Sequence, residues 1–562
     1  LNLHGNDPVY WNDWSAGVLD QAKQSKRPIF VSIGYFSCHW CHVMQRESYQ
    51  NPAIAKTLNK NFISVKVDRE LHPDLDRILI DFVETTRGVA GWPLNVFLTP
   101  EGYPLTGFTY QPPENFHSLL NNLTREWQAR GDELAKAAES YHLQRQQQLQ
   151  ASKMRSTDIP TERLIEGFVS QAMLIADELQ GGFGNTSKFP NIPQLASLLV
   201  LIKHDLHLDQ DVSDFVQLSL DAMASGNLKD HINHGFFRYV TDPDWNTPHF
   251  EKMLYTNAQL AKLYLEAHTL WPDRGYQQLG FEAIDFLERH LKHPDGGYMS
   301  SVSAVDRNDK EGGAYWWNQD ELKRFLSDEE IQYLSSKAYF NRLESEFLPG
   351  PLSGPGSSGN SQTNQRILEK MTLRGTASMP VDDKRIASWN ALVLDVLSLA
   401  ATRDERFTSI AHSQYKNMRR LFFQGQNISR FANHPDSARS GLEDYVELAN
   451  ALFQYGKNLN QPEAIQLAQH LVKQSYQRYL LKGWWRVQPG GSAVLETSKW
   501  IIPDATFHSP MSIWVHLALS MPDLDPKLKA VAVEMTRRVT QDLVEAPYYY
   551  GSFILTRLVP EN

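Results

Sequence analysis

The chain has 562 residues, a formal net charge of -10 and a hydrophobic fraction of 41%. This length exceeds what one ordinary hydrophobic core holds, so we expect two domains or more. The acidic balance leaves no basic stripe that could neutralise phosphates, which argues against nucleic acid as a partner. No uninterrupted apolar run in the sequence reaches the length of a membrane span.

Residues 1–132 alternate between short apolar runs and helical patterns. Short runs rich in β-branched residues are typical of buried strands, and a 3.6-residue apolar period is typical of helices. The order of these patterns indicates a βαβ unit followed by a β-hairpin, which is an α/β arrangement. The predicted strands are residues 28–35, 62–67, 91–98 and 104–110, and the predicted helices are residues 14–24, 43–58, 75–86 and 113–130.

Both cysteines of the chain lie in one motif, Cys38-His39-Trp40-Cys41, between the first predicted strand and the helix that follows it. Free amide hydrogens at a helix N-terminus stabilise an anion, and only the thiolate form of cysteine is nucleophilic. We therefore predict that Cys38 attacks a disulfide and that Cys41 resolves the mixed disulfide. His39 and Trp40 are expected to support this redox site.

The dipeptide Trp92-Pro93 opens the third predicted strand. A cis peptide bond at this position would present backbone groups to a substrate, as a thioredoxin-type site requires.

Three other interpretations of the cysteine motif stay open. With His42 it matches the C-x-x-C-H pattern of haem attachment, with His39 or His42 it could bind zinc, and it could be a purely structural disulfide. We favour redox use, and we expect neither a metal nor another cofactor.

From residue 158 to residue 562 strand patterns almost disappear and amphipathic helices recur. A Gln- and Ala-rich stretch, residues 133–157, is predicted to be a helical linker, and the Gly- and Ser-rich residues 349–365 a flexible loop. Glycine-aromatic sequences such as Gly181-Gly182-Phe183 recur between helices, which favours a ring of helical hairpins. The predicted helices are residues 164–176, 195–203, 215–224, 254–267, 283–291, 389–400, 442–455, 464–480, 511–520 and 528–543.

Several loops between these helices place polar groups among aromatic residues, a composition typical of polar-ligand pockets. A histidine or carboxylate held at the start of a helix can serve acid–base chemistry or bind sugar hydroxyls. The alternative is that the carboxylates cap helices and that the histidine fills a polar corner. The residues predicted to line this pocket are Arg238, His249, Glu251, Lys252, Asp383, Trp389, Asn390, Asp444 and Tyr445.

Motifs along most of the chain resemble the spermatogenesis-associated, thioredoxin-domain family, long described as a domain of unknown function. The resemblance implies an α/β thioredoxin-like N-terminal domain and an all-α (α/α)6 toroid, similar to six-hairpin glycosidases and N-acylglucosamine epimerases. The toroid implies a carbohydrate ligand by analogy of fold alone. The matching motifs are Pro28–Gly34, Cys38–Met44, Val67–Glu70, Gly91–Pro100, Pro248–Tyr255, Asp383-Lys384, Ser388-Trp389-Asn390 and Asp444-Tyr445.

The chain departs from the family pattern at Leu71-His72-Pro73, at Phe108 and in the Gly-Ser loop near residues 350–360. The G-x-G-x-x-G in that loop, residues 354–359, has neither a strand before it nor a helix after it, so we treat it as a chance match. No G-x-S-x-G, P-loop or H-E-x-x-H motif occurs, so serine hydrolase, NTPase and zincin activities lack support.

We therefore predict a thiol–disulfide oxidoreductase-like protein that acts on a thiol or disulfide protein substrate and carries a toroid with a carbohydrate pocket. The first alternative is a carbohydrate-active enzyme, an epimerase or glycoside hydrolase, that acts in the toroid. The second is a non-catalytic binding or chaperone-like module. Because the dithiol contains every cysteine of the chain, a periplasmic or exported location is slightly favoured over the cytoplasm. The oligomeric state is left open.

Overall fold

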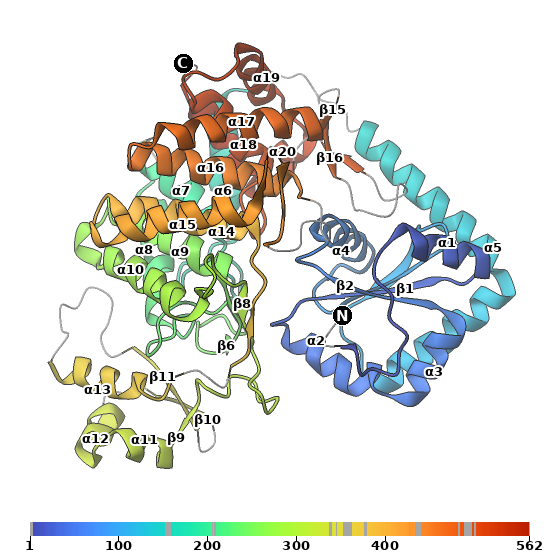
Figure 1. Ribbon diagram of the computed structural model, residues 1–562, viewed down its shortest axis with the longest axis horizontal. Helices are drawn as coiled ribbons and strands as arrows, with labels where there is room; N and C mark the ends of the chain where they lie inside the picture. Colours follow the sequence, from blue (N-terminus) through green and yellow to red (C-terminus); the bar gives the residue numbers. More distant parts are fainter. Residues whose placement is uncertain are drawn as a thin grey trace. The chain divides into compact units, whose positions relative to one another are not determined.

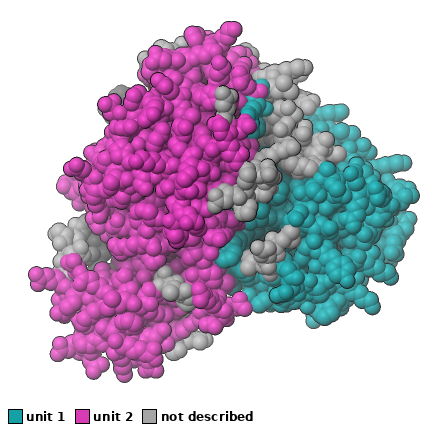
Figure 2. Space-filling model, in the orientation of Figure 1, with its two compact units in different colours: residues 1–153, 478–500 teal, residues 154–477, 501–562 magenta. Residues whose placement is uncertain are grey.

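The computed structural model describes residues 4–151, 159–204, 206, 209–336, 340–343, 346–351, 362–375, 379–425, 427–432, 440–481, 484–487, 497–499 and 502–560 (Figure 1). Contacts divide the chain into two compact units. Unit 1 contains Leu1–Lys153 and Arg478–Trp500, and unit 2 contains Met154–Gln477 and Ile501–Asn562 (Figure 2). Within the described residues, no helix has the length and apolar character that crossing a membrane requires.

Unit 1 is built on a four-stranded sheet with the order β2-β1-β3-β4. Strand β1 (Ile29–Gly34) pairs in parallel with β2 (Ile63–Asp68) and antiparallel with β3 (Leu94–Leu98). Strand β3 in turn pairs antiparallel with β4 (Pro104–Phe108). Because β1 and β3 are buried at every position, both faces of the sheet are covered. The predicted βαβ unit followed by a hairpin is confirmed.

Two hydrophobic clusters lie on the two faces of this sheet, and Figure 1 shows α4 and α3 on opposite sides of it. On one face, Ile29, Val31 and Ile33 of β1 pack with residues of α1 and α4. On the other face, Phe30 packs with residues of α3 and α5. Ser32 and Gly34 follow Phe30 at even spacing, so they share its face. The helices of unit 1 are α1 (Ala16–Ser25), α2 (His39–Met44), the π-helical turn η2 (Gln45–Tyr49), α3 (Pro52–Asn61), α4 (Pro73–Arg87) and α5 (Pro113–Ala151).

Helix α5 contains most of the expected linker, residues 133–157. It continues to Ala151 past Arg130, whose backbone is not helical. Residues 152–157 lie outside the described residues, and the exact domain boundaries stay a prediction. Unit 1 also includes a small sheet of β15 (Leu480–Leu481), β16 (Trp484–Val487) and β17 (Thr497–Lys499).

In the described part of unit 2, six helices form a closed inner ring. Each contacts the next along the chain, and the last contacts the first. Helices α9 and α14 are buried on nearly every side, as expected of helices enclosed by others. The inner helices are α7 (Ile192–Lys203), α9 (Leu254–Ala267), α14 (Ala387–Ala401), α16 (Leu442–Asn458), α18 (Pro510–Ser520) and α21 (Gly551–Leu555).

An outer helix accompanies each inner helix, so the described part of unit 2 consists of six hairpins. Helix α8 contacts α7, α10 contacts α9, α15 contacts α14, α19 contacts α18 and α6 contacts α21, and α17 follows α16 after a short turn. This double ring confirms the expected (α/α)6 toroid. The outer helices are α6 (Thr161–Leu174), α8 (Gln210–Ser225), α10 (Tyr276–Phe286), α15 (Arg406–Phe422), α17 (Pro462–Tyr479) and α19 (Pro526–Arg537).

Small antiparallel bridges connect outer helices to the inner helices that follow. They pair Ala176 with Phe183, Lys229 with Phe236 and Lys292 with Tyr298. These are the predicted glycine-aromatic sequences; in the first, Gly182 has a φ of +74 and a β-carbon there would lie 2.6 Å from a ring atom of Trp245. Gly483-Trp484-Trp485 is another sequence of this kind, and its glycine lies outside the described residues. The loops therefore gather at the N-terminal ends of the inner helices.

Further elements decorate the toroid. Between α10 and α14 a small subdomain has its own hydrophobic cluster, which includes Trp317 and Ile367. Of the predicted flexible loop, residues 352–361 lie outside the described residues. The remaining elements are the helices α11 (Gln319–Phe325), α12 (Asp328–Ser336), α13 (Gln362–Thr372) and α20 (Gln541–Glu545), the turns η3 (Pro272–Arg274), η4 (Leu287–Leu291), η5 (Pro547–Tyr550) and η6 (Thr556–Leu558), and the strands β5 (Tyr239–Val240), β6 (Pro248–His249), β7 (Lys252–Met253), β8 (Ser301–Val302), β9 (Trp317–Asn318), β10 (Phe340–Leu343), β11 (Glu346–Pro349), β12 (Val381–Asp382), β13 (Phe423–Gln424) and β14 (Asn427–Ile428).

Candidate functional site

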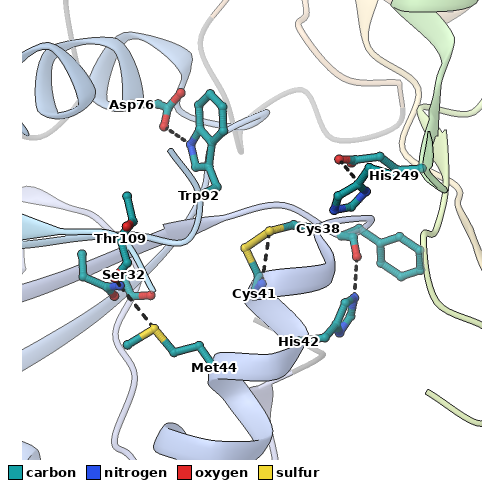
Figure 3. Close-up of a disulfide and its surroundings, with 12 residues drawn as sticks. Ser32, Cys38, Cys41, His42, Met44, Asp76, Trp92, Thr109 and His249 are labelled. Atoms are coloured by element: carbon teal, nitrogen blue, oxygen red, sulfur yellow. Dashed lines mark hydrogen bonds and ion pairs between the residues drawn. A yellow bond between two sulfur atoms is a disulfide. The ribbon is translucent and has the colours of Figure 1, made fainter. Parts of the chain in front are cut away.

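Cys38 and Cys41 form a disulfide at the start of α2 (Figure 3). Cys38 is the N-cap residue of this helix, and its Sγ accepts a hydrogen bond of 3.2 Å from the backbone nitrogen of Cys41. Helix α2 continues directly into η2, so the helical segment extends beyond its first six residues. The amide that faces Cys38 Sγ is the kind of donor that stabilises a thiolate once the disulfide is reduced.

Strand β1 lies against the disulfide through a residue without a side chain. A β-carbon built on Gly34 would lie 2.9 Å from Cys41 Sγ, which is closer than ordinary packing allows. Glycine is therefore the residue that lets the backbone of β1 approach the sulfur. Two residues earlier and on the same face, Ser32 begins a buried polar chain.

This chain of hydrogen bonds runs from β2 to α2. Lys66 Nζ donates to Ser32 Oγ at 3.0 Å, and Ser32 shares a hydrogen bond of 2.8 Å with the Tyr49 hydroxyl. Tyr49 donates to Asn95 Oδ1 at 2.8 Å, and Asn95 Nδ2 donates to Met44 Sδ at 3.3 Å. Because the Tyr49 hydrogen is used by Asn95, the Ser32 hydroxyl must donate to Tyr49. The helix that carries the dithiol is thus tied to both central strands.

Lys66 is the charged member of that chain, and its side chain is buried. Burial lowers the pKa of Lys66 from 10.5 to about 8, and the negative charges of Asp7 and Asp68 oppose this fall. The ammonium group also lies 4.9 Å from the centre of the Tyr49 ring. A buried cation supported by a hydroxyl and an aromatic face is a costly arrangement in a domain core.

The loop before β3 holds the other predicted part of the redox site. The Trp92–Pro93 peptide bond is cis, as expected. Trp92 Nε1 donates to Asp76 Oδ1 at 2.7 Å, and the Arg69 guanidinium lies 3.8 Å from the Trp92 ring centre. Arg69 Nε is also 3.6 Å from Asp76 Oδ2. Helix α4, through Asp76, therefore fixes the indole that precedes Pro93 (Figure 3).

Trp40 is the most exposed part of the cysteine motif, with 45% of its surface accessible. Its ring lies 5.5 Å from that of His39 and 5.0 Å from that of Tyr110. His42 turns inward and its Nε2 lies 2.8 Å from the Phe36 carbonyl oxygen. An exposed aromatic residue beside a disulfide is a suitable contact for an extended polypeptide.

The haem and zinc interpretations of the motif need free sulfur atoms. In the disulfide neither sulfur can ligate zinc or form a thioether bond with haem. Within the described residues, no group of three or more His, Cys, Asp or Glu side chains is arranged to hold a metal ion. The redox and structural interpretations are the ones that match the disulfide.

The structure brings three of the residues predicted for the toroid pocket together. Arg238 Nη1 lies 3.2 Å from Glu251 Oε1, and His249 Nδ1 lies 3.6 Å from the same oxygen. Burial lowers the pKa of His249, so its imidazole is neutral at pH 7. The His249 ring stacks on Tyr239 with centroids 4.8 Å apart. Of these residues, Arg238 lines a cavity of about 200 Å3 beside Tyr255.

Lys252 belongs to an ion pair of its own. Its Nζ lies 2.6 Å from Asp230 Oδ2 and donates to the His234 carbonyl oxygen at 2.8 Å. Burial raises the pKa of Asp230, but the nearby Lys252 ammonium lowers it by more, so the pKa lies below its usual value. The rings of Phe237 and Phe286 lie 5.0 Å and 4.7 Å from the ammonium. These contacts support a structural role for Lys252.

Asn390 and Asp444 connect loops to the inner helices. Asn390 Oδ1 accepts from the Tyr298 amide at 2.8 Å, and its Nδ2 donates to the Tyr298 carbonyl at 3.0 Å. Asp444 accepts from Arg430 Nη1 at 2.8 and 2.9 Å, and from the Gly441 amide at 2.9 Å. The motifs that contain Asn390 and Asp444 therefore hold loops against the inner helices.

The last three predicted residues have different surroundings. Trp389 packs edge to face on Tyr255 with centroids 4.7 Å apart, and Tyr445 is fully buried. Asp383 is exposed. The structure thus assembles the group around Glu251 and leaves Asp383 without burial. Whether the predicted set forms a sugar site stays a prediction.

Sequence reasoning missed a larger cavity, of about 510 Å3, which is lined by residues of all six inner helices. Lys262 Nζ of α9 lies 2.7 Å from Asp395 Oδ2 of α14, and Asn450 Nδ2 of α16 donates to the same oxygen at 3.3 Å. Glu266 and Glu447 also line this cavity. A lone charged residue in an otherwise apolar helix, as Asp395 is in α14, was the available sequence indication.

The chain is similar to one family model and to proteins of other organisms. Residues 1–146 match the family model Thioredox_DsbH, described as a protein of unknown function, DUF255. An uncharacterized protein of Caenorhabditis elegans is 35% identical over 348 residues, which cover 59% of this chain and 47% of that protein. Spermatogenesis-associated protein 20 of Homo sapiens is 36% identical over 351 residues, which cover 58% of this chain and 44% of that protein.

The expected resemblance to the spermatogenesis-associated, thioredoxin-domain family is confirmed. The match spans less than half the length of either of these two relatives. Among solved structures, a cellobiose 2-epimerase from Spirochaeta thermophila is 14% identical, with 74% of this chain and 96% of that chain covered and a TM-score of 0.45. A DsbH oxidoreductase is 22% identical, with 21% of this chain and 85% of that chain covered and a TM-score of 0.18.

Proposed function

We propose that the protein is a thiol–disulfide oxidoreductase that uses Cys38 and Cys41. The observation that carries this proposal is the Cys38–Cys41 disulfide at the start of α2, with the Cys41 amide directed at Cys38 Sγ. The Trp92–Pro93 loop and the exposed Trp40 supply the surroundings that a polypeptide substrate needs. The substrate class is a protein that contains a disulfide or a pair of thiols.

The reaction proceeds in two exchanges. In the reduced protein the Cys38 thiolate attacks one sulfur of the substrate disulfide, forms a mixed disulfide and expels a substrate thiolate, which takes up a proton. The Cys41 thiolate then attacks Cys38 Sγ, forms the disulfide seen here and expels the second substrate thiolate. Two electrons pass from the dithiol to the substrate, and an external dithiol must return the protein to its reduced form. Oxidation of a dithiol substrate is the same sequence in reverse.

Two cysteine variants test this assignment. Cys38→Ser removes the attacking sulfur, so the full chain should lose disulfide reduction in an insulin reduction assay. Cys41→Ser keeps the first exchange but not the second, so it should accumulate a mixed disulfide that mass spectrometry detects. Retained turnover in Cys38→Ser, or no mixed disulfide in Cys41→Ser, contradicts the proposal.

We propose carbohydrate binding or conversion in the toroid as the second candidate function. The supporting observation is the cavity of about 200 Å3 beside Arg238, which Phe189 and Tyr255 also line. Aromatic rings next to a charged group suit the apolar face and the hydroxyl groups of a sugar ring. Turnover of a sugar that survives loss of both cysteines would support this function, and a broad glycan panel without binding would exclude it. Cysteine variants that keep partner binding would instead favour a chaperone-like module.

A further inference from the structure

The cavity of about 510 Å3 inside the inner ring contains more carboxyl groups than lysine or arginine side chains. Its titratable lining residues are three carboxylates from different helices, one lysine and three histidines. Burial lowers the pKa of His508 and that of His516 to about 4 each, so neither carries a charge at pH 7. The titratable lining residues are His204, Lys262, Glu266, Asp395, Glu447, His508 and His516.

The one lysine of this cavity is already used by two of the carboxylates. Lys262 Nζ lies 2.7 Å from Asp395 Oδ2 and 3.9 Å from Glu266 Oε1. Asn450 adds a hydrogen bond to the same Asp395 oxygen at 3.3 Å. The positive charge of Lys262 therefore compensates Asp395 first and Glu266 in part.

Glu447 is the third carboxyl group of the cavity, and it takes no part in the ion pairs of Lys262. Only 4% of the residue is accessible, and it lines the cavity from α16. The ion pairs of Lys262 are with Asp395 and Glu266, and its charge acts on Glu447 only at longer range. No hydrogen bond or ion pair of Glu447 is seen among the residues that the structure describes. Burial, with the nearby charges of Glu443 and Asp395, raises the pKa of Glu447 well above its usual value. A polar group that is nine-tenths buried normally has a partner, so a bound molecule is the expected partner here.

We propose that this cavity binds a small molecule that carries a protonated amine, with the ammonium group against Glu447. An ammonium group supplies three hydrogen-bond donors and the charge that the three carboxylates lack. A neutral hydroxyl compound would leave the charge imbalance in place, and an anion would add to it. The size suits a ligand of a few tens of atoms at most, because binding cavities of this class measure about 300 to 1,000 Å3.

Binding changes the protonation of the site in a defined way. The raised pKa of Glu447 means that its carboxyl group keeps a proton to a higher pH than an exposed glutamate does. An ammonium group beside it favours the carboxylate, so binding drives this proton into solvent while the amine keeps its own. Up to one proton therefore leaves the complex for each ligand bound, and no bond of the ligand breaks. Apolar lining residues, including Leu263, Leu392 and Ile513, would contact the carbon frame of the ligand.

Two sources of the amine are distinguished by paired probes. Isothermal titration calorimetry of the full chain at pH 7 compares putrescine with 1,4-butanediol and glucosamine with glucose, in two buffers that differ in ionisation enthalpy. At least one amine should bind tenfold or more tightly than its neutral counterpart, with a net release of protons. A preference for putrescine identifies an alkyl amine as the ligand type, and a preference for glucosamine identifies an amino sugar.

Glu447→Gln keeps the shape of the side chain and removes its charge. This variant should weaken amine binding tenfold or more, abolish the proton release and leave the unfolding temperature unchanged or higher. Glu463→Gln is the matched control, because Glu463 is exposed on α17 and is not among the residues that line the cavity. Cys38→Ser should bind amines normally, which separates this test from that of the redox function.

Three results would overturn the proposal. The first is that neither amine binds, and the second is that each amine binds no better than its neutral counterpart. The third is that Glu447→Gln binds amines as the wild type does. The proton release measured on the wild-type protein needs no variant, so a poorly folded Glu447→Gln still leaves the proposal open to disproof.

Discussion

Gly34 of β1 faces Cys41 of α2 so closely that a β-carbon on residue 34 would lie 2.9 Å from Cys41 Sγ. We expect Gly34→Ala to destabilise the oxidised protein by about 1–3 kcal/mol, because the added methyl group overpacks the disulfide. The reduced protein should lose less, since a free thiol can rotate away. Thermal unfolding of both redox states checks this prediction.

The matched control is Gly17→Ala in α1. There the nearest atom to the added β-carbon, Ser15 Oγ, is 3.7 Å away, and alanine favours a helix over glycine. This variant should keep or slightly raise stability in both redox states. An equal loss in the oxidised and reduced Gly34→Ala protein would show that the disulfide does not set the requirement for glycine.

Asp76 positions Trp92 through the 2.7 Å hydrogen bond to its indole. We expect Asp76→Ala to lower the rate of disulfide exchange by about tenfold and the free energy of unfolding by about 1 kcal/mol, because a partly buried donor loses its acceptor. Asp76→Asn keeps an oxygen acceptor at the same place and should restore most of the rate. An Asp76→Asn protein as slow as Asp76→Ala would instead indicate that the charge, and so the contact with Arg69, is what matters.

The local features of the redox site follow from short stretches of sequence. The strand before Cys38, the helix after it and the position of Trp92-Pro93 are each visible in patterns of about ten residues. The hydrogen-bond chain from Lys66 to Met44 is not, because parallel pairing of β1 and β2 is needed to place Lys66 beside Ser32. A lysine in a predicted buried strand was the available indication.

In the toroid, too, the features with a regular local sequence pattern were predicted, and those that depend on contacts between distant residues were not. Residues 254–267 form α9 as predicted, because their 3.6-residue period has no interruption. The predicted helix 528–543 is two helices, since Thr540 caps a new start by accepting from the Leu543 amide. Helix α15 was missed because its apolar stripe contains Gln414, which is buried through its hydrogen bond to Asn390. The cavity residues escaped notice because a single charge in an apolar helix resembles a tolerated exception.

The pH dependence of stability should reveal the buried Lys66. Its pKa falls from 10.5 in the unfolded chain to about 8 in the folded protein, so its penalty is fully present below pH 8. Between pH 8 and 10.5 the unfolded chain binds more protons, and stability rises with pH. Lys66→Met should therefore raise the free energy of unfolding at pH 7 by about 1–3 kcal/mol and reduce this rise.

Thermal unfolding between pH 6 and pH 10 compares Lys66→Met with the wild type. Lys60→Met is the matched control, because Lys60 is exposed on α3. That control should follow the pH profile of the wild type. If Lys66→Met and the wild type run parallel over the whole range, Lys66 does not change its protonation on folding.

Lys252 and Asp230 should behave as one structural unit. Lys252→Met leaves the Asp230 carboxylate buried with two backbone donors, the amides of Ile232 and Asn233, and without a counter-ion. We expect a loss of about 3–5 kcal/mol in the free energy of unfolding. Adding Asp230→Asn should recover much of this loss, because a neutral amide can remain buried. Lys292→Met, which removes the exposed partner of Glu288, should cost about 1 kcal/mol or less in the same thermal measurement. If Lys252→Met unfolds like the wild type but loses sugar binding, Lys252 is a ligand-binding residue, as its place in the predicted pocket implies.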